Sequence, residues 1–469
     1  MCYPLIFKEN RLYVCYMGMK ALHVVIGILV FGIFNAFEVS AFDAKALGLA
    51  IWMVYWWIVQ PIPLYATALL PIIVGMPFDL IDSGPLAQAY GNHMIFLFFG
   101  GFVLALGIEK WNLHEQIAFT IIRTFGQTPV RILGGFMAAT AFLSMWISNT
   151  ATALMMLPIA LSVIRAIPRF REKKLFSIGL MMSIAFSANI GGTATLIGTP
   201  PNIQMAGILD QEFNVQIDFF QWFIFAFPFM LLMLIITFFT LRFFFVKRAS
   251  FEMGEIDKRK LDVNQKRVLG LFTLVVICWM SRSFVNDYLP VAINDTSIAL
   301  SGALLLFILP SKEGSSLLNW EDLTRLPWGI LFLFGGGMAL ASILADANIV
   351  SYLITQLTPL VQLPSVILVL IIVSIALFST ELMSNLALVS LLIPLIGELA
   401  LEMGIPLFGI SAGVALSASC AFMLPVATPP NAIVYSSRLL TVKNMMKYGF
   451  LLNMITVVVI TGLVYLVFF

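Results

Sequence analysis

Long apolar segments recur along the whole chain and determine its fold class. Of the 469 residues, 61% are hydrophobic and 11% are charged, whereas a soluble domain carries roughly a quarter charged residues. A membrane-spanning helix needs about 20 mainly apolar residues. The sequence therefore predicts an all-α polytopic membrane protein, which we expect in the plasma (inner) membrane among lipid. The candidate spans are 21–37, 45–60, 63–77, 93–109, 132–147, 175–190, 219–245, 267–285, 291–310, 328–345, 364–380, 406–424 and 448–469.

The first apolar segment follows Lys8, Arg11 and Lys20, an arrangement that resembles a secretory signal peptide. The segment is long, and no convincing small-residue cleavage site follows it. We therefore expect residues 21–37 to be a retained first span.

Other function classes find little support in the sequence. The four cysteines and three histidines are isolated from one another, so neither a zinc site nor a redox site is expected. No block of Lys and Arg interleaved with aromatic residues indicates nucleic-acid binding. A membrane-embedded hydrolase would need a base beside a buried serine, and no Ser–His pairing is repeated. A passive channel is a further alternative, and it accounts less well for the paired helix breaks described below.

The distribution of basic residues predicts the topology. Lys and Arg concentrate in loops 165–174, 247–267 and 438–447, whereas loops 210–218 and 397–405 carry only acidic charges. Cytoplasmic loops are enriched in Lys and Arg. We therefore expect a cytoplasmic N-terminus, an external C-terminus and an odd number of crossings. About 11 transmembrane helices satisfy this pattern if two further apolar segments are re-entrant helical hairpins.

Three segments of the first half of the chain return in the second half in the same order, which indicates an internal duplication. The charge pattern places the two hairpins on opposite sides, so the repeats are expected to be inverted, as in many secondary transporters. The paired segments are 93–113 with 328–349, 144–158 with 380–394, and 192–204 with 422–434. The expected organisation is an N-terminal segment with the first helix (1–44), repeat 1 (45–246), a cytoplasmic linker (247–266) and repeat 2 (267–469).

Each repeat contains a polar triplet inside an apolar segment. The triplets are Ser148-Asn149-Thr150 and Ser384-Asn385-Leu386. Polar residues are costly at membrane depth unless they line a cavity or end a helix. Such residues cap helices, and two exposed helix N-termini can bind an anion without Arg or Lys. A single triplet would more often be a polar packing pair, but its recurrence in both repeats favours a site.

Each repeat also contains a double proline, in Gly198-Thr199-Pro200-Pro201-Asn202 and in Ala427-Thr428-Pro429-Pro430-Asn431. Two prolines remove two backbone donors and leave carbonyl oxygens free to bind a small cation such as sodium. Ordinary proline kinks are the alternative interpretation. Glu381, which lies near the second triplet, is either a functional carboxylate or a structural acceptor for backbone donors.

On both triplets, both Thr-Pro-Pro-Asn turns and the stretch 418–427 that leads to Asn431 and Val434, the sequence resembles the divalent anion:sodium symporter family of INDY-type sodium/dicarboxylate carriers. The resemblance implies eleven spans, two re-entrant hairpins, a homodimer held by a scaffold domain, and a transport domain that moves as an elevator. It implies two sodium sites, one formed by Ser144, Ser148, Asn149 and Gly198 and the other by Thr380, Met383, Asn385 and Ala427. The expected substrate-binding residues are Ser148, Asn149, Thr150, Thr199, Pro200, Ser384, Asn385, Leu386, Thr428 and Pro429.

Leu386 departs from the family pattern, because many members carry Thr at this position. The change removes a hydroxyl donor and adds bulk at one end of the site. We expect a secondary transporter rather than an enzyme, with no cofactor and with Na⁺ as the coupling ion. The expected substrates are the C4-dicarboxylates succinate, malate and fumarate. The alternatives are a sodium-independent dicarboxylate or anion exchanger, and a carrier of citrate or sulfate on the same fold.

Overall fold

The computed structural model describes residues 4–37, 39, 42–167, 170–246, 260–288, 293–349, 352 and 363–469. Within this part of the chain the regular structure is helical, apart from one isolated bridge between Pro310 and Ser316. Seven of the described helices are long and apolar enough to cross a membrane, and eight shorter apolar helices accompany them. The chain is therefore an integral membrane protein. Most of the predicted linker 247–266 lies outside the described residues.

The first half of the chain forms the helices up to the predicted linker. They are α1 (Pro4–Asn35), α2 (Ala44–Val59), α3 (Leu64–Thr67), the π-helical turn η1 (Pro71–Gly75), α4 (Ser83–Tyr90), α5 (His93–Lys110), α6 (Leu113–Phe125), α7 (Pro129–Ser144), α8 (Asn149–Ala166), α9 (Phe170–Gly192), α10 (Pro200–Phe213), α11 (Phe219–Leu241) and the π-helical turn η2 (Arg242–Val246).

The second half follows a similar order. Its helices are α12 (Val263–Val285), the 3₁₀ turn η3 (Asn286–Tyr288), α13 (Asp295–Ile308), the 3₁₀ turn η4 (Trp320–Arg325), α14 (Trp328–Asp346), α17 (Ser365–Thr380), α18 (Asn385–Met403), α19 (Leu407–Ser419), α20 (Pro429–Ser436) and α21 (Val442–Phe468).

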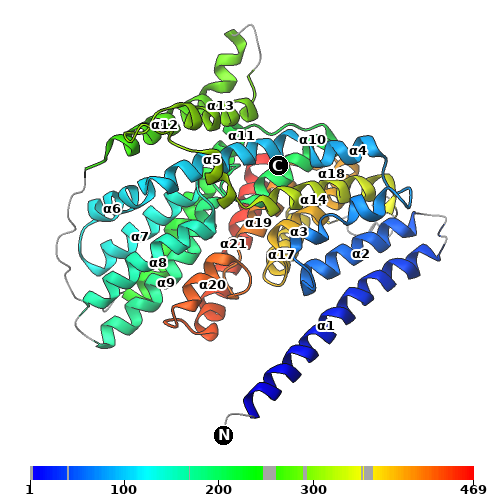
Figure 1. Cartoon of the computed structure of the whole chain (residues 1–469), viewed down its shortest axis with the longest axis horizontal. Helices are drawn as coiled ribbons and strands as arrows, with labels where there is room; N and C mark the ends of the chain where they lie inside the picture. Colours follow the sequence, from blue (N-terminus) through cyan, green and yellow to red (C-terminus); the bar gives the residue numbers. More distant parts are fainter. Residues whose placement is uncertain are drawn as a thin grey trace.

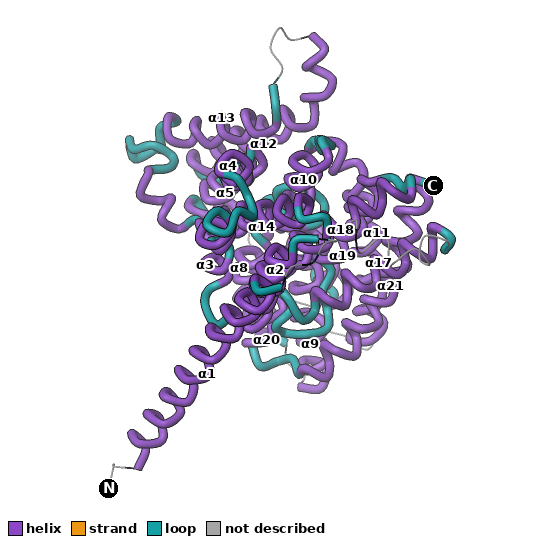
Figure 2. The backbone as a smooth tube through the Cα atoms, turned by 90° about the vertical axis from the view of Figure 1, so that its right-hand side faces the viewer, coloured by secondary structure: helices purple, strands orange, loops and turns teal. Residues whose placement is uncertain are grey.

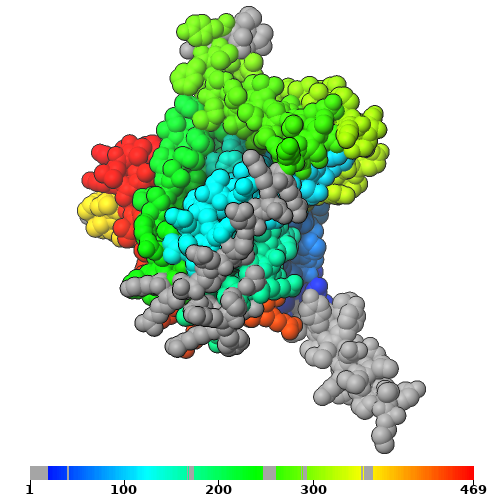
Figure 3. All heavy atoms as spheres, turned by 90° about the vertical axis from the view of Figure 1, so that its left-hand side faces the viewer, coloured from blue at the N-terminus to red at the C-terminus, as the bar shows by residue number. Residues whose placement is uncertain are grey.

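The helices gather into one body from which α1 extends at an angle (Figures 1 and 2). α12 and α13 lie along one end of this body, and α20 lies toward the opposite end (Figure 1). In Figure 3 the green helices α12 and α13 cover the end of the molecule above the cyan segment that holds α5 and α6. α13 packs directly on α5, which joins a helix of the first half to one of the second.

Helical hairpins form at both places where the sequence predicts them. α7 turns into α8 through residues 145–148, and α17 turns into α18 through residues 381–384. Each second arm begins at the Asn of a polar triplet and contains one proline, Pro158 or Pro394. The structure thus has a helix break at each triplet, and the re-entrant course of the hairpins stays a prediction.

The chain also unwinds before each double proline. α9 ends at Gly192 and α10 begins at Pro200, while α19 ends at Ser419 and α20 begins at Pro429. A proline has no N–H to donate, so the carbonyls of the preceding segment need other partners. The Nδ2 of Asn202 donates to three of them, on Gly192, Thr193 and Thr195.

Asn431 has the same role in the second half. Its Nδ2 donates to the carbonyls of Ala421 and Leu424, at 3.1 and 3.0 Å. The asparagine that follows each double proline thus holds the unwound segment before it, in the same way in both halves.

The expected spans 21–37 and 63–77 correspond to the apolar helices Lys20–Asn35 and Leu64–Gly75. The helix α1 extends further toward the N-terminus, to Pro4, and the expected span 406–424 ends at Ser419 because the chain unwinds there. Within 63–77 the chain forms α3, which follows Pro63, and the π-helical turn η1, which begins at Pro71. The sequence analysis missed α6, because its polar and apolar residues lie on different faces of the helix instead of forming an apolar run.

Candidate functional site

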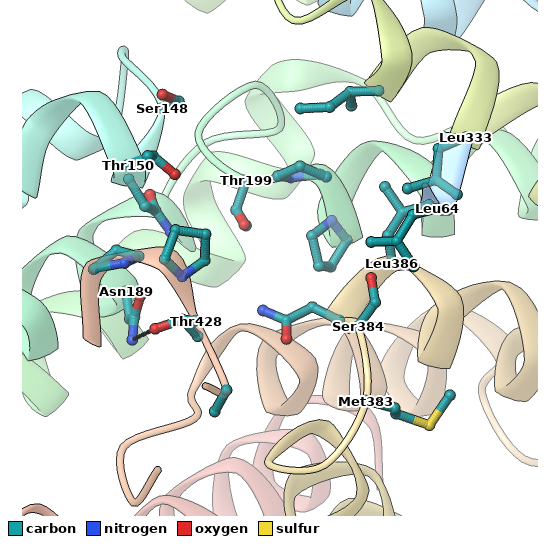
Figure 4. Close-up of a pocket in the computed structure, with 18 of the residues that line it drawn as sticks. Leu64, Ser148, Thr150, Asn189, Thr199, Leu333, Met383, Ser384, Leu386 and Thr428 are labelled. Carbon is teal, nitrogen blue, oxygen red and sulfur yellow. Dashed lines mark hydrogen bonds between the residues drawn. The ribbon is translucent and has the colours of Figure 1, made fainter. Parts of the chain in front are cut away.

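A cavity of about 540 Å³ lies where the two hairpins and the two unwound segments meet. The first residues of four helices line it, and their N-cap residues are Ser148 (α8), Thr199 (α10), Ser384 (α18) and Thr428 (α20). Figure 4 shows these four side chains around the cavity. All ten predicted substrate-binding residues line it, so the structure brings together segments that are far apart in the sequence.

The electrostatic potential in the cavity comes from the helix ends, because every described residue that lines the cavity has an uncharged side chain. The N-terminus of a helix carries a partial positive charge and N–H groups without intrahelical partners. α8 and α18 begin with residues that have an N–H, whereas α10 and α20 begin with two prolines. Two of the four helix ends can therefore donate hydrogen bonds to an anion, and the other two contribute their dipoles.

The opposite wall is mainly apolar. It is built by side chains of α2, α3, α5 and α14: Trp57, Ile58, Leu64, Tyr65, Phe98, Phe102, Ile330 and Leu333. The sequence did not indicate these residues, because an apolar side chain within an apolar span does not differ from its neighbours in the sequence. The cavity therefore lies between a polar wall from the repeated motifs and an apolar wall from other helices.

Three oxygen atoms crowd together behind the first triplet. The Ser144 Oγ lies 2.5 Å from Asn149 Oδ1 and 2.7 Å from the Ala188 carbonyl oxygen. A serine hydroxyl has one hydrogen, so it can donate to only one of these acceptors at a time. The cluster is therefore rich in oxygen and poor in donors, which is the environment that a hard cation prefers.

The second hairpin repeats this arrangement. The Thr380 Oγ1 lies 2.7 Å from Asn385 Oδ1 and 2.9 Å from the Ala418 carbonyl oxygen. Here too, a single hydroxyl hydrogen is available for two acceptor oxygens. Both hydroxyl residues are fully buried, and both clusters lie directly behind the asparagine that begins the second arm.

The backbone closes tightly around the first cluster. A Cβ atom added to Gly192 would collide with Asn149 Oδ1, and one added to Gly198 would collide with the Gly192 carbonyl oxygen. Glycine at both positions lets the unwound segment approach the asparagine closely.

The eight predicted sodium-binding residues fall into two groups. Six of them line the cavity, and Ser144 and Thr380 lie behind it in contact with the two asparagines. The six are Ser148, Asn149, Gly198, Met383, Asn385 and Ala427. Their role in binding sodium stays a prediction.

Asn189 of α9 was missed in the sequence and is a functional candidate. Its Nδ2 donates to the Ala421 carbonyl and the Thr428 Oγ1, each at 3.1 Å, and the second bond is drawn in Figure 4. Its own Oδ1 is buried without a hydrogen-bond partner, and the residue lines the cavity. A polar residue near the end of the apolar helix α9 was the available signal.

Glu381 accepts hydrogen bonds from backbone donors, which favours the structural one of the two interpretations left open by the sequence. Its Oε1 accepts from the N–H groups of Phe422 and Met423 at 2.8 and 2.9 Å, and its Oε2 accepts from Leu424 N at 3.0 Å. The Asn453 side chain adds a fourth donor at 2.8 Å. The carboxylate thus satisfies the donors of the unwound segment between α19 and α20.

Comparison with known proteins identifies the family. The profile of the sodium:sulfate symporter transmembrane region matches residues 17–468. The chain belongs to this family. Its members are membrane transporters rather than enzymes, which confirms the class expected from the sequence.

Two relatives are named sodium-dependent dicarboxylate transporter SdcS. The protein of Staphylococcus aureus (strain USA300) is 36% identical over 442 residues, covering 90% of this chain and 85% of the relative. The protein of Staphylococcus saprophyticus is 34% identical over 461 residues, covering 93% and 88%. These relatives confirm the resemblance expected from the motifs.

Two solved transporter structures share the fold. The Neisseria gonorrhoeae MtrF structure, described as illuminating a class of antimetabolite efflux pumps, has a TM-score of 0.61 at 11% identity and covers 97% of this chain and 95% of its own. The Alcanivorax borkumensis YdaH transporter has a TM-score of 0.56 at 12% identity and covers 83% and 90%. At these identities the likeness concerns the fold alone.

Proposed function

We propose that this protein is a sodium-coupled carrier that takes up C4-dicarboxylates such as succinate, malate and fumarate. One observation carries the proposal: two helix N-termini with free N–H groups line one cavity, and a donor-poor oxygen cluster lies directly behind each of them. A dicarboxylate has two negative groups for the two helix ends, and each cluster offers a place for one Na⁺. The relatives named as sodium-dependent dicarboxylate transporters support this assignment.

The anion is held without a basic side chain. The free N–H groups of the first turns of α8 and α18 donate to the two carboxylates, and hydroxyls of the N-cap residues add further donors. Two separate helix ends suit a molecule with two anionic groups better than a compact anion such as sulfate.

Sodium binds as a co-substrate beside the anion. In the first hairpin the ligands are the oxygens of Ser144, Ser148 and Asn149 together with the backbone at Gly198. In the second they come from Thr380, Met383, Asn385 and Ala427, several of them backbone carbonyls. Each Na⁺ replaces a crowded oxygen contact by an attractive one, and its charge offsets that of a nearby carboxylate. Coupling follows, because each ion stabilises the other.

The proposed architecture is two inverted repeats with 11 crossings and two re-entrant hairpins. The matching roles of Ser144 with Thr380 and of Asn202 with Asn431 support the duplication. The hairpins and broken helices form the transport domain, and the helices of the apolar wall belong to a scaffold through which two copies form a homodimer. The transport domain moves as an elevator, with the N-terminus cytoplasmic and the C-terminus external.

Counterflow into proteoliposomes tests the substrate class. Vesicles preloaded with unlabelled succinate in sodium buffer should accumulate labelled succinate, malate and fumarate, while labelled citrate and sulfate should accumulate at least tenfold less. Equal accumulation of sulfate would contradict the dicarboxylate assignment. Succinate counterflow that is the same without sodium would favour an exchanger.

A further inference from the structure

The two ends of the cavity differ because the two triplets differ at their third position. Thr150 occupies this position in the first triplet and Leu386 in the second, and both residues line the cavity. Leu386 is 4% exposed, so its side chain is enclosed by its neighbours.

Two other leucines lie beside Leu386 in the lining of the cavity. Leu64 of α3 and Leu333 of α14 also line the cavity, and α14 packs against both α18 and α3. Figure 4 shows the three side chains gathered beside Ser384. We call Leu64, Leu333 and Leu386 the leucine wall.

The other end of the cavity carries hydroxyl and amide groups. Figure 4 shows Ser148, Thr150, Asn189, Thr199 and Thr428 on the side away from the leucine wall. Thr199 makes no hydrogen bond to cap its own helix, and Asn189 has a buried oxygen without a partner. A hydroxyl group on a substrate can find hydrogen-bond partners at this end.

We propose that the leucine wall makes binding depend on which inner carbon of the dicarboxylate carries a hydroxyl group. This inference rests on the proposed function. The carbon beside the carboxylate bound at Ser384 must be unsubstituted or carry an apolar group, whereas the carbon beside Thr150 can carry a hydroxyl. A hydroxyl placed against the leucine wall loses its water without gaining a partner, because the Ser384 hydroxyl beside the wall already binds the carboxylate, and that loss opposes binding.

The rule ranks three acids of the same length. Succinate has no hydroxyl and binds in either orientation. Malate has one hydroxyl and binds in the orientation that directs it toward Thr150. Tartrate has a hydroxyl on both inner carbons, so either orientation places one against the leucine wall. An apolar pocket discriminates against an added hydroxyl by about 100-fold, and tartrate should bind weaker than malate by roughly that factor.

Binding to the purified protein in sodium buffer tests this rule without requiring transport. The unfolding temperature of the protein is measured at increasing concentrations of succinate, 2-methylsuccinate, malate or tartrate. Inhibition of labelled succinate uptake by each acid gives a second measure. We expect malate within about fivefold of succinate, 2-methylsuccinate bound, and tartrate at least 30-fold weaker than malate. Tartrate within threefold of malate would overturn the inference. No stabilisation by succinate itself would overturn the proposed function and the inference together.

Variants test whether the leucine wall is responsible. Leu386→Thr should reduce the difference between malate and tartrate by about tenfold or more. Leu64→Thr, at a less buried position of the leucine wall, should act in the same direction and provides a second variant if Leu386→Thr is unstable. Leu391→Thr is the matched control, because Leu391 is a partly buried residue of α18 that does not line the cavity. Unchanged ratios in two folded leucine-wall variants would overturn the assignment.

Discussion

The hydroxyl of Ser144 lies 2.5 Å from the side-chain oxygen of Asn149 while a second acceptor, the Ala188 carbonyl, lies 2.7 Å away. Thr380 has the same relationship to Asn385 and Ala418. A single hydrogen cannot satisfy two acceptors, and a sodium ion among these oxygens would relieve the conflict. This geometry is the physical basis of the proposed sodium coupling.

Removing either hydroxyl should weaken sodium activation. Ser144→Ala and Thr380→Val each delete one cation-binding oxygen, so the sodium concentration for half-maximal uptake should rise by about tenfold, equivalent to roughly 1.4 kcal/mol. Thr380→Ser keeps the hydroxyl and serves as the control. The measurement is initial succinate uptake against sodium concentration. Unchanged sodium curves for both hydroxyl-free variants would remove these residues from the cation sites.

A negative charge at the triplet asparagines should abolish anion binding. Asn149→Asp and Asn385→Asp keep an oxygen and nearly the same volume but add a carboxylate beside the substrate. At 4 Å and an effective dielectric near 20, the repulsion is about 4 kcal/mol. Succinate should no longer stabilise these variants against thermal unfolding, although they elute as folded protein in size-exclusion chromatography. Folded aspartate variants that transport at the wild-type rate would contradict the site, and aggregation of both would favour a packing role.

Replacing Glu381 should affect folding more than ion coupling. Glu381→Ala leaves three backbone N–H groups and the Asn453 amide without their acceptor, and each buried unsatisfied donor costs about 1–3 kcal/mol. We expect a strong loss of thermal stability and of extractable protein. Glu381→Gln keeps one acceptor oxygen and should be intermediate. A fully stable Glu381→Ala protein with altered sodium dependence would show that the carboxylate acts in transport.

An ion cluster between three helix ends gives a separate stability prediction. Arg282 of α12 lies 3.1 Å from Asp218, the N-cap of α11, and 3.1 Å from Asp295 at the start of α13. Arg282→Met leaves two largely buried carboxylates without their cation, and breaking a buried pair in this way costs about 3 kcal/mol or more. The melting temperature should fall clearly more than for Arg123→Met, a basic residue in the last turn of α6. Equal melting temperatures would contradict this role.

The sequence indicated the repeated motifs that line the cavity, but it did not indicate the apolar residues that line the rest of it. The triplets and double prolines are easily recognised, because polar or helix-breaking residues in an apolar segment are costly unless they line a cavity or end a helix. Trp57, Phe98 and Leu333 give no such contrast, so the apolar wall appeared only when the fold brought α2, α5 and α14 to the cavity.

The interpretation of Glu381 required the structure for a different reason. The sequence places a carboxylate near the second triplet but cannot say which donors surround it. The three N–H groups that donate to it belong to residues about 40 positions later in the sequence. The unwinding after α19 leaves these N–H groups without helical partners. Helix ends were also hard to predict, because the unwinding at Ser419 depends on the partners that Asn431 and Glu381 provide.

Sodium dependence of succinate uptake tests the central claim most directly. Proteoliposomes are measured with an inward gradient of sodium, potassium or choline, at zero and at inside-negative membrane potential. The two oxygen clusters predict uptake that needs sodium and rises sigmoidally with its concentration. If net positive charge enters, an inside-negative potential should accelerate uptake, because each charge gains about 2.3 kcal/mol per 100 mV. Uptake that is unchanged when potassium or choline replaces sodium would contradict the account.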